Sequence, residues 1–225
     1  WYSARINIRS IQIIILILGI IGTIAFSISG ALTSIEKHLD LFGVCILGVI
    51  TSCGGGVLRD TMLHKEIVMF TEWWYPLISL CTSLLVFLFM FKLRNFEWEN
   101  SKIYQTTYNL VDSLGLGAFV VVGANSAMNT GIINWFPIIF YAVLTAVGGG
   151  LLRDIFVCKI PDIFRKHIYA VASIIVAAYH YILIQAGCIY AINVTSTVML
   201  IVIIRYLAYH YKLSLPKIKL KDDKN

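Results

Sequence analysis

The motif Gly-Gly-Gly-x-x-Arg-Asp occurs twice in this sequence, at residues 54–60 and 148–154, each time inside an apolar run. Glycine in an exposed helix interior costs roughly 1 kcal/mol relative to alanine, and it permits backbone angles that other residues avoid. One interpretation is a helix break that turns backbone groups toward a water-filled path. The other is close packing of helices through small residues. Because two triplets stand at matched positions, each followed by Arg-Asp, the pattern favours a functional break. The glycines are Gly54, Gly55, Gly56, Gly148, Gly149 and Gly150.

Charged residues accompany both motifs where a membrane makes them costly. Arg59 and Arg153 lie in or beside apolar runs, and a charge at the centre of a membrane helix costs at least about 2.5–3.5 kcal/mol. Each arginine precedes an aspartate, Asp60 or Asp154, which can neutralise it. Asp112 stands at the same end of another apolar run as Arg153, so a pair between them is geometrically allowed. We expect these five residues to be pore or gate charges, with ordinary interfacial anchoring as the alternative for the arginines.

Five polar residues within the same apolar runs are candidate pore-lining groups. They are Ser27, Ser29, Thr51, Asn125 and Thr145. Each of them alone is more often a helix–helix hydrogen-bonding residue than an ion ligand.

No pattern in the sequence indicates catalysis, a cofactor or a bound metal. The five histidines have no metal-ligand spacing, and none of the five cysteines forms a Cys-x-x-Cys pair. The glycine motif is not a nucleotide-binding loop, because it lacks Gly-Lys-Ser/Thr. The sequence therefore predicts a protein that is not an enzyme and that holds no cofactor and no tightly bound metal.

Composition places these motifs in a membrane protein. Only 13% of the 225 residues are charged and 59% are hydrophobic, whereas soluble domains carry about 25% charged residues. A membrane helix needs about 20 apolar residues, and seven segments qualify: 11–33, 41–58, 75–91, 104–124, 132–152, 168–185 and 189–208. Backbone groups in lipid must be paired internally, so the segments are helices of one all-α membrane domain over 1–225. The chain starts at Trp1 rather than Met, which is compatible with a short leader before it.

An internal repeat relates the two halves of the chain. Residues 22–31 resemble 115–124, residues 51–60 resemble 145–154, and Tyr75 matches Tyr169. Each unit holds three helices, and because three is odd the second unit enters the membrane from the opposite face. We therefore expect two inverted three-helix repeats with a seventh helix outside them. Inverted repeats bring matching elements together near the midplane, where transporters and some channels place their pathway. The expected ranges are 11–91 and 104–186 for the repeats, 188–209 for the seventh helix and 210–225 for a basic tail.

Lysine and arginine are distributed unequally between the two sides of the predicted bundle. Of the 18 in the chain, four fall on the side of the N-terminus and 14 on the other. Basic segments stay in the cytoplasm, so we expect a multi-pass protein of the cell (inner) membrane with the N-terminus outside. The net charge of +6 then indicates topology and contact of the basic tail with anionic lipids, rather than nucleic-acid binding.

The two Gly-Gly-Gly-x-x-Arg-Asp copies, the Ala-Phe-x-x-x-Gly-Ala stretches at 25–31 and 118–124, and Pro161 ahead of Tyr169 together resemble one known family. This is the prokaryotic trimeric intracellular cation (TRIC) channel family, whose members are also described as glycine-transporter-domain membrane proteins. The resemblance covers nearly the whole chain except the termini. It implies a homotrimer with one pore per protomer, second and fifth helices kinked at the glycines, and passage of monovalent cations, chiefly potassium.

The sequence departs from the family pattern in two places, both at the expected outer mouth. Gly19 stands where members of the family often have an acid, and the first repeat has no proline to match Pro161. Two functions remain open at this stage. One is a channel permeable to potassium or sodium, and the other is a secondary transporter of glycine or another small neutral amino acid, which would hold the substrate carboxylate with half-helix ends. A purely structural membrane subunit is a third reading.

Overall fold

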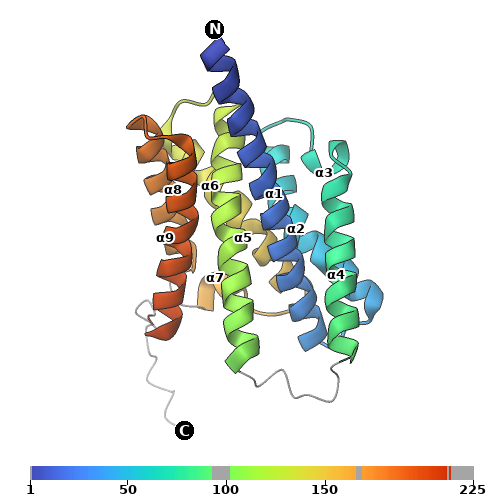
Figure 1. Cartoon of the computed structure of the whole chain (residues 1–225). Coiled ribbons are helices and arrows are strands. Elements are labelled where there is room, and N and C mark those ends of the chain that lie inside the picture. Colours follow the sequence, from blue (N-terminus) through green and yellow to red (C-terminus); the bar gives the residue numbers. More distant parts are fainter. Residues whose placement is uncertain (1, 93–101, 166–168, 212, 214–225) are drawn as a thin grey trace.

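The computed structural model describes residues 2–92, 102–165, 169–211 and 213. Within these ranges the chain is a bundle of α-helices joined by short turns (Figure 1). In chain order the helices are α1 (Tyr2–Glu36), α2 (Leu41–Met62), α3 (Val68–Thr71), α4 (Trp74–Lys92), α5 (Lys102–Met128), α6 (Trp135–Phe156), α7 (Asp162–Arg165), α8 (Tyr169–Gln185) and α9 (Tyr190–His210). Most of the basic tail predicted at 210–225 lies outside the described residues.

Among the described residues, six helices are long and apolar enough to cross a membrane, judged by length and composition. They are α1, α2, α4, α5, α6 and α9, while α8 is a shorter apolar helix of 17 residues. The seven predicted spans coincide with these seven helices, so the predicted all-α membrane class is confirmed. The bounds differ most at the N-terminus, where α1 begins at Tyr2 rather than at residue 11. The sequence missed α3 and α7, because a four-residue helix is too short to produce a hydrophobic period.

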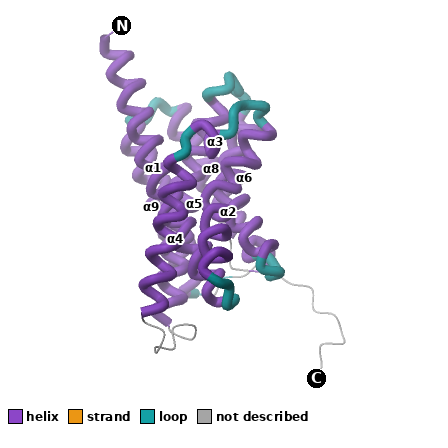
Figure 2. The backbone as a smooth tube through the Cα atoms, turned by 90° about the vertical axis from the view of Figure 1, so that its right-hand side faces the viewer, coloured by secondary structure: helices purple, strands orange, loops and turns teal. Residues whose placement is uncertain are grey.

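The two halves of the chain have the same order of elements, two long helices, a short helix and another long one. Helices α1 and α4 run in one direction and α2 in the other (Figures 1 and 2). In the second half α6 runs with α1, whereas α5 and α8 run with α2, so the second unit is inverted. Helix α9 packs against α5 and α8. We call the end of the bundle where α1 begins the N-terminal face, and the end where α9 finishes the C-terminal face.

Matched polar caps start the second helix of each unit. The Asp40 carboxylate accepts a hydrogen bond from the Gly43 backbone N–H at 2.8 Å. The Asn134 side-chain oxygen accepts one from the Phe136 backbone N–H at 3.2 Å. Such caps satisfy backbone donors that have no partner in the first turn of a helix. The same device therefore fixes the start of α2 at the C-terminal face and that of α6 at the N-terminal face.

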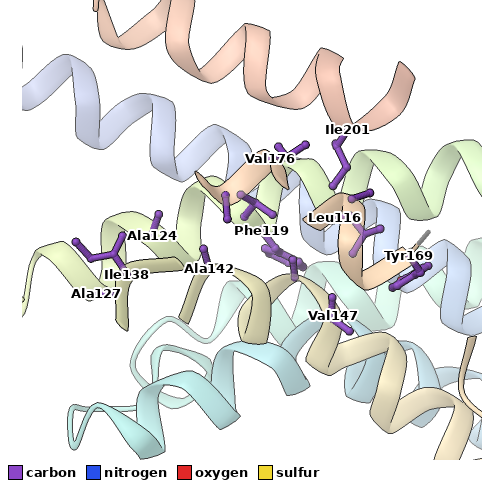
Figure 3. Packing of buried hydrophobic residues seen from close by; sticks show 14 of the residues in the cluster. Leu116, Phe119, Ala124, Ala127, Ile138, Ala142, Val147, Tyr169, Val176 and Ile201 are labelled. Atoms are coloured by element: carbon purple, nitrogen blue, oxygen red, sulfur yellow. The ribbon is translucent and has the colours of Figure 1, made fainter. Parts of the chain in front are cut away.

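The internal two-fold relation is also present in the core. Buried apolar side chains from α5, α6, α8 and α9 pack together around Phe119 (Figure 3). Phe26 of α1 meets Phe119 of α5 edge to face, with ring centroids 5.1 Å apart. A methyl group on Gly22 would overlap the Phe119 ring, and one on Gly115 would overlap the Phe26 ring. The repeated glycine and phenylalanine positions therefore let α1 and α5 cross closely at the centre.

Large apolar side chains cover much of the outside of the bundle. Leu85 and Phe89 on α4, Ile182 on α8 and Ile192 on α9 are all more than half exposed. A soluble monomer rarely exposes apolar surface on this scale. Lipid or another subunit must therefore cover these faces.

Candidate functional site

Both glycine triplets lie within uninterrupted α-helix. Helices α2 and α6 include all six glycines, and among the described residues the glycines with positive φ are Gly131 and Gly187. The structure therefore does not confirm the predicted break in the second and fifth helices. The physical reason is packing, because a Cβ on Gly55 would collide with the Thr145 carbonyl and one on Gly149 with the Thr51 carbonyl. The glycines let the backbones of α2 and α6 approach more closely than a methyl group allows, which is the packing alternative.

The two threonines at this crossing are also packing residues. A Cβ on Gly30 would lie 2.6 Å from the Thr51 hydroxyl, and one on Gly123 would lie 2.6 Å from the Thr145 hydroxyl. Each threonine hydroxyl donates to a backbone carbonyl of its own helix at 2.6 Å. Thr51 and Thr145 therefore hold α1 against α2 and α5 against α6.

The Arg-Asp pairs form the same contact at opposite faces of the bundle. Arg59 Nε donates to Asp60 Oδ1 at 2.8 Å, and Arg153 Nε donates to Asp154 Oδ1 at 2.9 Å. All four side chains are buried. Each aspartate thus neutralises the arginine before it, so neither motif presents an isolated positive charge.

The second oxygen of each aspartate holds the short helix that follows. Asp60 accepts from the Val68 backbone N–H at 3.1 Å, and Asp154 accepts from the Asp162 backbone N–H at 2.8 Å. The residue before Val68 is Ile67, which stands where the second repeat has a proline. Its φ of −73° is close to the angle of about −65° that proline imposes. The missing proline therefore leaves the local backbone arrangement unchanged.

A network of buried charges fills the bundle at the C-terminal face. Arg153 Nη1 lies 3.2 Å from Asp112 Oδ1 and donates to Ser29 Oγ at 2.7 Å. The Ser29 hydroxyl is itself 3.2 Å from Asp112. Arg205 Nη2 approaches the other Asp112 oxygen at 3.7 Å, and Arg153 Nη2 lies 3.8 Å from Asp162. The structure thus brings Asp112 and Arg153 together, as their positions in the sequence had suggested.

Two aromatic rings complete this network. The Arg205 guanidinium lies 4.4 Å from the centre of the Tyr169 ring, and that of Arg153 lies 5.4 Å from the Tyr108 ring. Both distances are within the range of cation–π attraction. The network is electrically balanced, because Lys159 also lies 3.5 Å from Asp162. Its acids are Asp112, Asp154 and Asp162, and its bases are Arg153, Arg205 and Lys159.

Arg205 is a member of the site that no motif in the sequence indicates. From the sequence it contributes only to the count of lysines and arginines on the two sides of the bundle. The available signal was a charge within the otherwise apolar helix α9, since such charges usually face the interior of a bundle. No spacing rule could say which neighbour it would meet, because α9 lies outside the repeat.

The N-terminal face instead contains a cavity of about 350 Å³ between α1, α2, α4 and α5. Arg59, Asp60 and Asn125 are among its lining residues. Lys65 also lines the cavity. Its Nζ donates to Ser126 Oγ at 2.6 Å and lies 3.3 Å from Asp60. Polar, charged and apolar groups all border the cavity, so it can hold water and small ions.

Gly19 explains why the two faces differ. It occupies the position in α1 that Asp112 occupies in α5. A Cβ at Gly19 would lie 2.6 Å from the Tyr75 hydroxyl, so the tyrosine packs directly against this glycine. Both residues line the cavity. Among the residues that the structure describes, the N-terminal face therefore has no counterpart of the Asp112 network.

The five predicted polar residues separate into different places. Ser29 belongs to the charge network, and Thr51 belongs to the helix crossing. Thr145 and Asn125 line the cavity, where Asn125 also donates to the Tyr190 hydroxyl at 2.7 Å. Ser27 belongs to a separate group of buried hydroxyls between α1, α2 and α4. Sequence position alone did not distinguish these environments.

The fold and the buried charges define a helical membrane protein built from inverted three-helix units. The family model described as "Glycine transporter" matches residues 16–90 and 109–185, one segment in each half of the chain. The chain is 33% identical over 215 residues to the UPF0126 inner membrane protein YadS of Escherichia coli K12, covering 92% of this chain and 97% of that protein.

Solved structures of TRIC channels share the fold. A prokaryotic TRIC channel in 0.5 M KCl matches with a TM-score of 0.79 and 32% identity, over 91% of this chain and 100% of that one. The TRIC trimeric intracellular cation channel orthologue from Rhodobacter sphaeroides matches with a TM-score of 0.79 and 28% identity, over 88% and 98%. The chain therefore belongs to the TRIC family. These neighbours are ion channels and not enzymes, which agrees with the expectation of no catalytic function.

Proposed function

We propose that the chain is a potassium-permeable cation channel with one pathway inside each protomer of a homotrimer. The observation that carries this proposal is the difference between its two faces. A cavity of about 350 Å³ reaches into the bundle from the N-terminal face, whereas buried ion pairs close the C-terminal face. A channel in a closed state needs both features on one path. The solved TRIC cation channels with the same fold support the assignment.

In this proposal the C-terminal network is the gate. Asp112 faces Arg153 and Arg205, and Arg153 also contacts Asp154. When either arginine moves away from Asp112, a carboxylate oxygen becomes free to attract a cation. The same movement opens a route for the ion past Asp112. Buried ion pairs suit a gate, because the interaction of the charges offsets a large desolvation cost and the balance can shift between two arrangements. Arg59 and Asp60 occupy the equivalent place at the open face.

The proposed setting is a bacterial inner membrane, as for the YadS relative. The distribution of lysine and arginine supports a cytoplasmic C-terminal face and a basic tail against anionic lipids. The cavity then opens to the outside, and the gate faces the cytoplasm. Potassium or sodium is the permeant ion, and no cofactor takes part.

Planar bilayers containing the purified protein test the proposal directly. With a potassium gradient across the bilayer we expect unitary currents that reverse near the potassium equilibrium potential. The matching family model carries the description "Glycine transporter", which supports a small-solute carrier as the second candidate. Silent bilayers combined with saturable uptake of labelled glycine into liposomes would favour that carrier. Liposomes without protein serve as the control in both assays.

A further inference from the structure

A group of buried serine hydroxyls lies between α1, α2 and α4. Ser79 Oγ is 2.7 Å from Ser27 Oγ and 2.9 Å from Ser52 Oγ. Ser27 Oγ is also 2.6 Å from the Thr23 carbonyl, and Ser52 Oγ is 3.2 Å from the Val49 carbonyl. Each hydroxyl has one proton to donate, so three protons must serve these four oxygen–oxygen contacts. The group therefore has more oxygen lone pairs than hydrogen-bond donors.

A fourth serine extends the group by one turn of α4. The Ser83 hydroxyl is fully buried and has no hydrogen-bond partner among the residues that the structure describes. It lies against Gly48 of α2, where a Cβ would overlap the Ser83 hydroxyl and stand 3.5 Å from the Ser27 carbonyl oxygen. Glycine at this position makes room for the hydroxyl. A buried polar atom without a partner is rare in native proteins and calls for an explanation.

The cluster of serine hydroxyls adjoins the cavity of the N-terminal face. Thr23 and Ser52 line that cavity, so the group adjoins the cavity through Ser52 and through Thr23, whose carbonyl contacts Ser27. Ser83 and Gly48 lie one helical turn further toward the C-terminal face. Oxygen atoms thus continue from the edge of the cavity toward the C-terminal face.

The second repeat shows that the fold does not require these hydroxyls. The positions that match Ser27 and Ser52 are Val120 and Ala146. Ser173 matches Ser79, and its hydroxyl donates at 3.3 Å to a backbone carbonyl of its own helix. The same helix packing therefore forms in the second repeat without a serine cluster.

We propose that Ser27, Ser52, Ser79 and Ser83 form a binding position for a partly dehydrated monovalent cation beside the cavity, which the ion reaches past Ser52. The inference rests on the proposed channel function and adds the residues that replace part of the ion's hydration shell. Neutral hydroxyl and carbonyl oxygens hold an ion strongly enough to admit it and weakly enough to release it. No carboxylate belongs to the group, so a divalent cation, which is usually held by carboxylates, binds less well there.

The test compares Ser79→Ala with the matched substitution Ser173→Ala in the second repeat. In planar bilayers we expect Ser79→Ala to lower the unitary potassium conductance several-fold, and Ser173→Ala to leave it unchanged. Ser83→Ala provides a second variant with the same expectation as Ser79→Ala. Equal conductance for Ser79→Ala and wild type, or equal losses for Ser79→Ala and Ser173→Ala, would overturn the inference.

A binding measurement separates this inference from the channel function. Melting temperatures of the detergent-solubilised proteins are recorded in potassium chloride and in N-methyl-D-glucamine chloride at equal ionic strength. We expect potassium to stabilise wild type and Ser173→Ala, and to have little effect on Ser79→Ala and Ser83→Ala. Silent wild-type bilayers contradict the proposed channel and leave this comparison intact. Equal potassium stabilisation of all four proteins contradicts the serine site.

Discussion

At the scale of single residues, one carboxylate compensates two buried arginines from distant parts of the chain. Asp112 lies 3.2 Å from Arg153 and 3.7 Å from Arg205. Removal of one partner from a buried ion pair costs about 3–5 kcal/mol, because a charge is left without compensation. We expect Asp112→Asn to lower the melting temperature of the purified protein and to raise the open probability in bilayers, since this carboxylate holds the closed network together.

A double-mutant cycle measures whether Asp112 and Arg205 act together. The double mutant Asp112→Asn/Arg205→Gln should lose less stability than the two single mutants lose together. We expect a coupling energy of about 0.5–3 kcal/mol. The control cycle pairs Asp112→Asn with Arg59→Gln at the opposite face, where effects should add. Additive melting data in both cycles would show that α9 does not contribute to the gate.

Sequence reasoning reached part of this site. It paired Asp112 with Arg153, because the repeat and the helix directions place both at one face. It could not assign Arg205, since the rotation of α9 about its axis is set by tertiary packing. It also gave no reason to group Ser52 and Ser79 with Ser27, because hydroxyls on three helices meet only after those helices have packed.

At the scale of elements, the crossing of α2 and α6 depends on individual glycines. Gly55 faces a backbone carbonyl of α6, whereas a Cβ on the neighbouring Gly56 would find only the Arg59 side chain, at 3.8 Å. We expect Gly55→Ala to destabilise the protein by about 1–3 kcal/mol through overpacking, which for a chain of this size lowers the melting temperature by roughly 2–12 °C.

Gly56→Ala is the matched control for this prediction, and it should leave the melting temperature unchanged or raise it slightly, because alanine favours helix. Gly149→Ala should repeat the loss in the second unit, where the carbonyl is that of Thr51. A similar melting temperature for Gly55→Ala and Gly56→Ala would mean that the crossing can widen at little cost.

The same glycines show where prediction of elements from sequence reached its limit. Apolar run length located all seven long helices, because the thickness of the membrane fixes that length. A glycine triplet, however, is compatible with a break and with a close crossing. The choice depends on what lies opposite each glycine, and a single sequence does not contain that information.

At the scale of the whole molecule, the internal symmetry holds for the contacts that pack the helices. It does not hold for the buried charges and hydroxyls of the proposed pathway. The caps of α2 and α6, the Arg-Asp pairs and the glycine crossing all occur twice. Asp112 of the C-terminal network has no counterpart in the first repeat, and the hydrogen-bonded group of Ser27, Ser52 and Ser79 has none in the second. The sequence predicted the repeated parts because matching residues reveal them. The unequal faces followed from single replacements, such as glycine for acid at Gly19, whose effects needed the packing to be known.

The exposed apolar faces lead to a prediction about assembly. If the chain forms the proposed homotrimer, the protein mass measured by light scattering in mild detergent should be three times the 25.3 kDa of one chain. Brief chemical crosslinking should give dimer and trimer bands and no larger species. A monomer mass at all protein concentrations would leave the exposed apolar surface to lipid alone and contradict the trimer.

The orientation of the molecule can be tested with its own cysteines. Cys158 follows the end of α6, which lies at the C-terminal face, and Cys188 lies between α8 and α9, which join at the N-terminal face. Both cysteines are exposed. Four of the 18 lysines and arginines lie on the N-terminal side and 14 on the other, and basic segments remain in the cytoplasm.

In a version that keeps only Cys188, a membrane-impermeant maleimide should label intact cells. In a version that keeps only Cys158, labelling should require permeabilised cells, and a reporter fused after Asn225 should behave as cytoplasmic. A version without cysteines controls for background, and labelling of Cys158 but not Cys188 in intact cells would reverse the proposed orientation and place the cavity on the cytoplasmic side.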